Sequence, residues 1–111
     1  QLFLSDDMFS AGEPFKLRAL CMGEPGDTAA DLYVILDVFG DYWFYPGWNP
    51  VPMCRRINLE NGHTAYHFIL DFIWPEGDFG HADGIYFWSA ITTPGTFKPI
   101  GDLDCVVFGY D

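Results

Sequence analysis

The side chains best suited to acid–base or nucleophilic catalysis are three histidines, His63, His67 and His81. They accompany neither a Gly-x-Ser-x-Gly motif nor a cysteine–histidine signature, the patterns that mark many nucleophilic sites. Glycoside hydrolysis needs two carboxylates at a fixed separation, and acids scattered through loops do not define such a pair. His67 alternates with apolar residues along a predicted strand, which is more typical of a surface or interface residue than of a general base. We therefore expect a protein that is not an enzyme.

Acidic residues gather in regions predicted to be loops or strand ends. Calcium prefers several oxygen ligands from such loops, but the Asp-x-Asp-x-Asp-Gly spacing of a calcium-binding loop does not occur. Calcium therefore stays an alternative to a solvated acidic surface that keeps the protein soluble, and no other metal or cofactor is expected. The acids in question are Asp6/Asp7, Glu24/Asp27/Asp31, Glu76/Asp78/Asp83 and Asp102/Asp104.

Three cysteines stand at positions 21, 54 and 105. They lack Cys-x-x-Cys spacing and only three histidines are present, so a zinc site is not expected. The basic pair after Cys54 is a weak signal for a lowered thiol pKa. The odd number permits one disulfide with one free thiol, an intermolecular bond, or three buried thiols.

Aromatic side chains make up 19% of the chain, more than a small core requires. Trp43, Tyr45 and Trp48 lie near a Pro-Gly corner and could form a flat platform for a sugar ring, as could Trp74 and Trp88. For each tryptophan the alternative is ordinary packing in the core or at a corner.

Alternation of apolar and polar residues with a period of two dominates the chain and predicts β-strands. In strand 15–22, Phe15, Leu17, Ala19 and Cys21 share one face. Gly40-Asp41 predicts a type II′ hairpin turn and ENGH (60–63) contains a second turn signal. In strand 64–74, one face is predicted to hold Tyr66, Phe68, Leu70, Phe72 and Trp74. The expected strands are 2–5, 15–22, 32–39, 42–45, 54–58, 64–74, 84–92 and 102–110.

Short strands separated by polar turns predict an all-β fold, a two-sheet antiparallel β-sandwich of about seven strands in a single domain, residues 1–111. An immunoglobulin-like or fibronectin-III-like order suits the strand count, and a jelly roll is the alternative.

The net charge of −11, from sixteen acidic and five basic residues, excludes most nucleic-acid partners, which need clustered Lys and Arg. It argues equally against an anionic membrane surface, and no stretch approaches the length needed to span a bilayer. Cations, neutral glycans and other protein surfaces remain as partners.

Four stretches, AGEPFKLRA (11–19), DLYVILDVFGDYWFYPGW (31–48), FIWPEGDFGHADGIYFWSAIT (72–92) and VVFGY (106–110), together resemble a β-sandwich module found near the C-terminus of large secreted or surface proteins of bacteria. The resemblance runs from Phe9 to Tyr110. It implies a location outside the cell and a structural or adhesive setting. In a fibronectin-like path, strand 15–22 ends at the pole where the crossing loop 46–54 begins, so Cys21–Cys54 is the expected disulfide.

Several strands are apolar on both faces, which exceeds what one small core can hide, and monomers rarely expose large apolar patches. We therefore expect a self-associating extracellular subunit of a filament, pilus-like fibre or surface layer, or an adhesive module. The alternative is a carbohydrate-binding module. The residues expected at the interface or facing a ligand are Tyr33, Phe39, Trp43, Tyr45, Trp48 and Phe87.

Overall fold

The structure is a computed structural model that describes residues 1–22, 29–59, 64–77, 80–100 and 103–111. The predicted turn at 60–63, the histidine at position 63 and four of the acids weighed as calcium ligands therefore lie outside the described residues. Those acids are Glu24, Asp27, Asp78 and Asp102.

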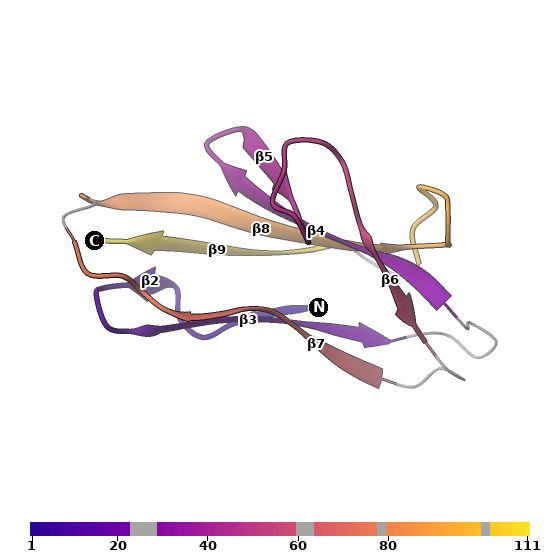
Figure 1. Ribbon diagram of the computed structural model, residues 1–111, viewed down its shortest axis with the longest axis horizontal. Helices are drawn as coiled ribbons and strands as arrows, with labels where there is room; N and C mark the ends of the chain where they lie inside the picture. The colour runs from indigo at the N-terminus through magenta and orange to yellow at the C-terminus, as the bar shows by residue number, and fades with distance from the viewer. Residues whose placement is uncertain (23–28, 60–63, 78–79, 101–102) are drawn as a thin grey trace.

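Within the described residues the chain folds into nine β-strands (Figure 1). No helix in this part has the length and apolarity needed to cross a lipid bilayer. The strands are β1 (Leu2–Leu4), β2 (Met8–Phe9), β3 (Pro14–Met22), β4 (Ala29–Val38), β5 (Asp41–Phe44), β6 (Arg55–Asn58), β7 (Thr64–Ile73), β8 (Ala82–Thr92) and β9 (Asp104–Tyr110).

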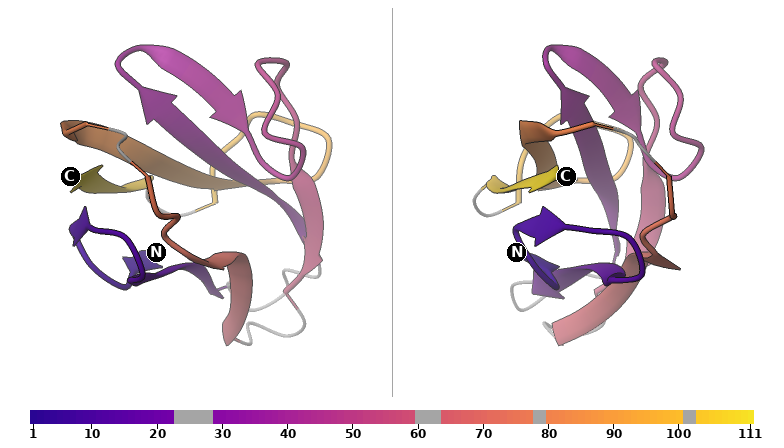
Figure 2. Two further views of the ribbon diagram at one scale, coloured as in Figure 1. Left: turned by 60° about the vertical axis from the view of Figure 1, so that its left-hand side comes forward. Right: turned by 90° about the vertical axis from the view of Figure 1, so that its left-hand side faces the viewer.

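The strands form two sheets that lie in two layers (Figures 1 and 2). A three-stranded sheet has the order β1-β3-β7, and a six-stranded sheet has the order β2-β9-β8-β4-β5, with β6 also paired to β4. The prediction of an all-β, two-sheet fold is confirmed. The prediction of purely antiparallel pairing is wrong at one place, because β2 runs parallel to β9. The opening segment divides between the layers, β1 in one sheet and β2 in the other, which raises the strand count above seven.

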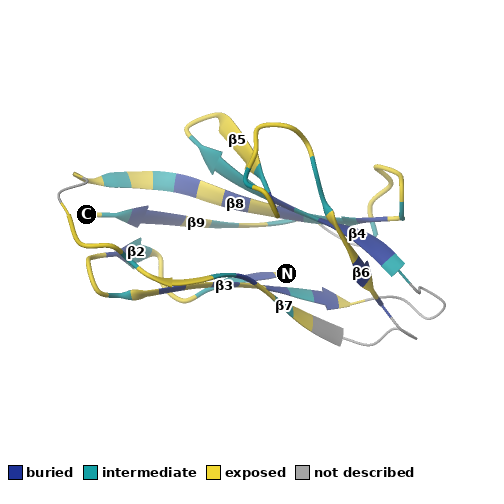
Figure 3. Cartoon of the chain, viewed as in Figure 1, coloured by how far each residue is buried: buried dark blue, intermediate teal, exposed yellow. Residues whose placement is uncertain are grey.

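Alternation along the strands places the core between the two sheets (Figure 3). In β3 the predicted inward residues are all buried, while Lys16 and Arg18 are exposed. Aromatic rings then join the layers: the Phe15 ring lies 4.5 Å from Phe9 and 5.3 Å from Phe108, centroid to centroid. Fully burying such a side chain contributes about 1.5–3 kcal/mol, so these contacts hold the sheets together.

The residues that β7 points toward the core differ from the prediction, because a β-bulge interrupts the pairing of β7 with β3. Leu17 pairs with Leu70 but Arg18 pairs with Phe68, so Ile69 is an extra residue. An extra residue reverses the alternation. Ile69 is 8% exposed and Phe68 is 67% exposed, the opposite of what unbroken alternation predicts.

Two consequences of the bulge concern residues that were predicted to point the other way. Tyr66 is exposed rather than buried, and His67 is half-buried opposite the buried Ala19 instead of lying on the surface. Burial, and next the positive charge of Arg55, lower the pKa of His67. Its Nε2 atom is buried without a hydrogen-bond partner in the described structure. Beyond the bulge, Phe72 stacks on Phe15 as the pattern predicts.

The turn between β4 and β5 also differs from its prediction. Val38 pairs with Asp41, which leaves Phe39 and Gly40 as the two turn residues. Their φ angles are +52° and +93°, and positive φ at both central positions is the signature of a type I′ turn rather than type II′. The Gly40 N–H donates a hydrogen bond to Asp37 Oδ1 at 3.0 Å.

The predicted Cys21–Cys54 disulfide is not formed, and all three cysteines carry free thiols. Cys21 points into the core from β3, and burial raises the pKa of its thiol. Cys54 instead interacts with Asp31 and Tyr33, which lie on the outer side of the six-stranded sheet. The two sulfurs therefore face different sides of that sheet.

Candidate binding surface on the six-stranded sheet

The outer face of the six-stranded sheet carries most of the features that could bind a partner. Leu32 and Val34 of β4 face the core and are fully buried, so Tyr33, Ile35 and Asp37 point outward. The register of β4 with its neighbours β5 and β8 places other outward residues beside them: Tyr33 pairs with Ala90, and Ile35 pairs with both Trp88 and Phe44.

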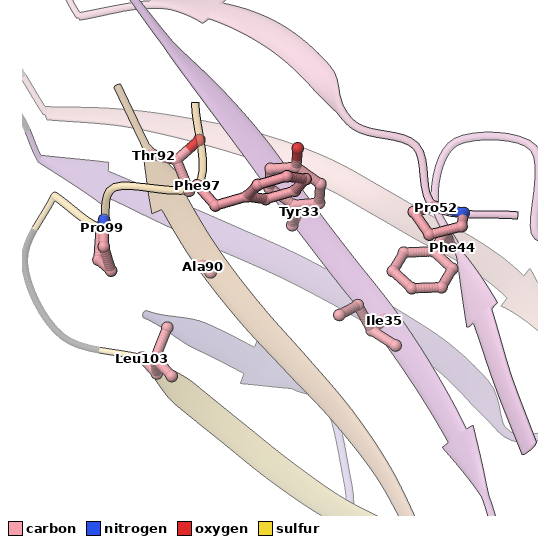
Figure 4. A pocket seen from close by; sticks show the side chains of 9 residues that line it. All are labelled: Tyr33, Ile35, Phe44, Pro52, Ala90, Thr92, Phe97, Pro99 and Leu103. Carbon is pink, nitrogen blue, oxygen red and sulfur yellow. The ribbon is translucent and has the colours of Figure 1, made fainter. Parts of the chain in front are cut away.

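At one end of this face the sheet is hollowed (Figure 4). The hollow has a volume of about 430 Å³, within the range of natural ligand pockets. The sheet forms its floor, the segment after β5 and the loop between β8 and β9 form its sides, and almost every group exposed in it is apolar. Its lining consists of Tyr33, Ile35, Phe44, Pro52, Ala90, Thr92, Phe97, Pro99 and Leu103.

The most exposed ring of the hollow is Phe97, which is 82% exposed. Its ring centroid lies 6.2 Å from that of Tyr33, and Figure 4 shows the two rings on one side with Phe44 and Pro52 on the other. Ile35 lies between these two groups. A ring of a partner could therefore enter between aromatic walls.

Asp31 holds the loop that carries Phe97. This buried carboxylate accepts hydrogen bonds from Arg56 Nε on β6 and from the Gly95 backbone N–H, the latter at 2.8 Å. The hydrogen bond from Arg56, followed by the one from Gly95, lowers the pKa of Asp31. One charged group thus connects β4, β6 and the loop, and it fixes one wall of the hollow.

Tyr33 provides one of the few polar atoms of the lining. Burial, and next its hydrogen bond with the Cys54 side chain, raise the pKa of the Tyr33 hydroxyl. A tyrosine hydroxyl is protonated at neutral pH even at its ordinary pKa, so Tyr33 presents a neutral ring edge to an apolar occupant.

Beside the hollow the outer face continues as a row of partly exposed rings. The Tyr86 and Trp88 rings of β8 lie 5.9 Å apart with an interplanar angle of 28°. Trp88 Nε1 donates a hydrogen bond of 3.3 Å to Asp37 Oδ2 on β4. A carboxylate next to adjacent rings is a combination that binds polar ligands with flat apolar faces.

The six residues predicted at the interface divide in the structure. Phe39 and Trp43 are exposed and Tyr33 is half-buried at the hollow, and their contact with a partner remains a prediction. Phe87 is 1% exposed and Tyr45 is 6% exposed. These two are core residues, so their predicted exposure is wrong.

The buried positions of Tyr45 and Phe87 have clear causes. Phe87 pairs with Leu36 on the inward face and stacks on Phe108. The Tyr45 hydroxyl accepts a hydrogen bond of 2.9 Å from Arg55 Nη1. Trp48 folds back over the core edge, with its ring 5.7 Å from Tyr45 and 6.0 Å from Phe87, so it is a corner-packing residue and not part of an open platform.

Sequence reasoning missed Phe97, Leu103 and Tyr86 as surface candidates. Phe97 stands between turn residues in TPGTFKP, outside any strand. A bulky ring in a turn has no strand face to pack it, and that was the available signal. For Tyr86 the alternation of β8 carried the information, because Ile85 and Phe87 already fill the core side.

The outer face of the three-stranded sheet also exposes rings but is arranged differently. Tyr66 and Phe68 project from β7, and the Arg18 guanidinium lies 5.9 Å from the centre of the Tyr66 ring. None of the residues lining the hollow lies on this sheet. Its exposed rings supply matched controls for experiments on the opposite face.

In the described residues no three His, Cys, Asp or Glu side chains are grouped so that they could hold a metal ion.

Comparison of the chain with models of protein families, with curated proteins and with solved structures gave no match.

Proposed function

We propose that this chain is a non-enzymatic, extracellular module of immunoglobulin-like type that works by association. The strand order supports the fold assignment: β1-β3-β7 corresponds to strands A, B and E, and β9-β8-β4-β5 to strands G, F, C and C′ of an immunoglobulin domain. A jelly roll, which has eight strands arranged in two Greek keys, fits this strand order less well. The extracellular or cell-surface setting rests on the resemblance of the sequence to bacterial surface modules.

The observation that carries the proposed activity is the apolar hollow on the outer face of the six-stranded sheet. Its lining residues come from three strands and two loops, yet nearly all of them present apolar atoms. An isolated soluble domain gains nothing from exposing such a surface. We infer that a protein surface covers it, and that the first partner to test is another copy of this chain, as in a filament, fibre or surface layer.

Sedimentation velocity over a range of protein concentrations tests this proposal. Phe97→Ser removes an 82%-exposed ring from the hollow, and Phe68→Ser removes a 67%-exposed ring from the other sheet as a matched control. We expect the wild type to associate with increasing concentration, Phe97→Ser to associate at least about tenfold more weakly, and Phe68→Ser to behave as the wild type. A wild-type protein that stays monomeric at millimolar concentration contradicts self-association.

A carbohydrate is the second candidate partner, supported by the Tyr86–Trp88 ring pair with Asp37 beside it. Adjacent rings can stack on the apolar faces of sugar residues while the carboxylate accepts hydroxyl hydrogen bonds. This site shares Trp88 with the second predicted platform, whose other member, Trp74, packs against the core. It differs from the first, since Tyr45 and Trp48 pack at the core edge.

A glycan array distinguishes this candidate. Binding that is lost in Tyr86→Ala and kept in Tyr66→Ala, its counterpart on the other sheet, would support it. If soluble polysaccharides and the array all fail to bind the folded wild type, the carbohydrate candidate falls and association remains.

A further inference from the structure

The tip of the β4–β5 hairpin carries an aromatic side chain in an unfavourable place. Phe39 has a φ of +52°, a region that costs residues with a Cβ atom free energy and that type I′ turns normally fill with Asn, Asp or Gly. The side chain is 69% exposed, so packing in its own chain does not offset the strain. Strained residues that persist without local compensation are candidates for a functional contact.

Trp48 provides an internal comparison. It has the same φ of +52°, but its ring packs against Tyr45 and Phe87. Packing explains the strain at Trp48 and leaves it unexplained at Phe39.

The ring of Phe39 cannot reach the hollow of its own molecule. Ile35, the lining residue of β4 that is nearest to Phe39, is four residues away along the extended strand and its turn, about 13 Å at the rise of a β-strand, and Tyr33 is about 20 Å away. Figure 1 shows the hairpin tip at the upper edge of the molecule and the loop between β8 and β9 toward its right-hand end. A ring at the hairpin tip and an apolar hollow separated from it suit a contact between two molecules.

The charged side chains at the hairpin tip and beside the hollow have opposite signs. The hairpin tip carries two acids, the half-buried Asp37 and the exposed Asp41. Lys98 lies between two lining residues of the hollow and is exposed, and Arg55 and Arg56 lie on the neighbouring β6. Arg56 is paired with Asp31 and Arg55 with the Tyr45 hydroxyl, so Lys98, next to Phe97 of the lining, is the basic side chain that we expect an acidic tip to meet.

We propose that Phe39 of one molecule inserts into the hollow of a second copy, with Asp41 facing Lys98. This inference rests on the proposed self-association and names the surfaces that make it. The contact is heterologous, because a tip on one copy meets a hollow on the next, and such contacts give open chains when the rotation between copies does not close a ring.

The first test uses Phe39→Asn, which suits the turn better than Phe and removes the ring. Association should weaken at least about tenfold while the melting temperature rises, so loss of association cannot be attributed to unfolding. Unchanged association would refute the inserted ring. If Phe97→Ser still weakens association in that case, the hollow binds another surface and the proposed function survives without this inference.

The second test mixes two variants in sedimentation experiments. Phe39→Asn keeps the hollow and lacks the ring, whereas Phe97→Ser keeps the ring and lacks a wall of the hollow. Each should be largely monomeric alone. A weak one-to-one complex on mixing, with Phe97→Ser supplying the ring, is the expected result; a mixture that remains monomeric contradicts the heterologous contact.

The third test exchanges charges. Asp41→Lys makes the chain two charges less acidic, which by general repulsion alone would strengthen association. The proposed contact instead predicts weaker association for Asp41→Lys and for Lys98→Asp, each by about two- to fivefold, and recovery in the double variant, whose net charge equals that of the wild type. Stronger association of Asp41→Lys alone would overturn the proposed pair.

Discussion

At the scale of single residues, Asp31 joins β4, β6 and the loop between β8 and β9. It is buried in β4 and binds both the Arg56 guanidinium and the Gly95 backbone N–H. Removing one member of such a group leaves donors without their acceptor, which typically costs about 1–3 kcal/mol. The loop that bears Phe97 depends on this carboxylate for its attachment to the sheet.

We expect Asp31→Asn to lower the free energy of unfolding at pH 7 by about 1–3 kcal/mol. The pKa of Asp31 is lowered in the folded state, so its contribution is present above the unfolded value near pH 4 and is lost as the pH falls through the folded value. Urea unfolding at several pH values should show the variant and the wild type converging below pH 4. An equal difference at pH 7 and at the lowest pH would contradict a role for the charge.

A second prediction at this scale concerns the stability of the turn at Phe39 and does not depend on any partner. Because Asn accepts positive φ more readily than Phe, Phe39→Asn should raise the free energy of unfolding by about 1 kcal/mol, measured by thermal or urea unfolding. The matched variant Tyr42→Asn, at an exposed position of β5, should not stabilise the protein. Destabilisation by Phe39→Asn would show that the ring packs on its own chain.

At the scale of elements, the bulge in β7 determines which side chains the three-stranded sheet exposes. One extra residue between Leu70 and Phe68 exchanges the two faces along the first half of the strand. The result is a strand whose first half points Tyr66 and Phe68 outward and whose second half points Leu70 and Phe72 toward the core.

Two alanine substitutions of neighbouring residues test the bulge. Ile69→Ala should destabilise the protein by about 2–4 kcal/mol because it leaves a cavity in the core. Phe68→Ala, at a position that is 67% exposed, should change stability by no more than about 0.5 kcal/mol. Chemical denaturation measures both changes in stability. A larger loss of stability for Phe68→Ala than for Ile69→Ala would contradict the bulge and favour unbroken alternation along β7.

At the scale of the whole molecule, charge opposes association while apolar surface favours it. The net charge of −11 makes copies repel, and salt screens this repulsion beyond about 10 Å at 0.1 M ionic strength. Both outer faces nevertheless carry exposed rings, and one is hollowed. Association should therefore depend strongly on solution conditions.

We expect self-association to strengthen as NaCl rises from about 0.02 to 0.5 M, because screening weakens the general repulsion more than it weakens a single ion pair. Light scattering at constant protein concentration measures this change. The double variant Asp41→Lys/Lys98→Asp, with an unchanged net charge, should follow the same salt dependence. Weaker association at high salt would mean that ion pairs, and not apolar surface, hold the copies together.

The sequence alone determined the fold class and much of the core. Alternation with a period of two is a local property, so it identified β3, β4 and β8 and the inward residues of β3 correctly. It also indicated surplus apolar surface, since several strands are apolar on both faces. Phe39 and Trp43 are exposed, because the hairpin that bears them lies beyond the core, and their place at an interface stays a prediction.

Only the tertiary structure decided which aromatic rings form a surface and which fill the interior. The bulge in β7 depends on how that strand pairs with β3 some fifty positions earlier, and nothing in its own alternation encodes it. The hollow unites β4 and β5 with the loops around Pro52 and Phe97, which are distant in sequence. Side-chain direction within a strand follows from local geometry, whereas a concave site depends on long-range strand pairing that a periodic pattern does not specify.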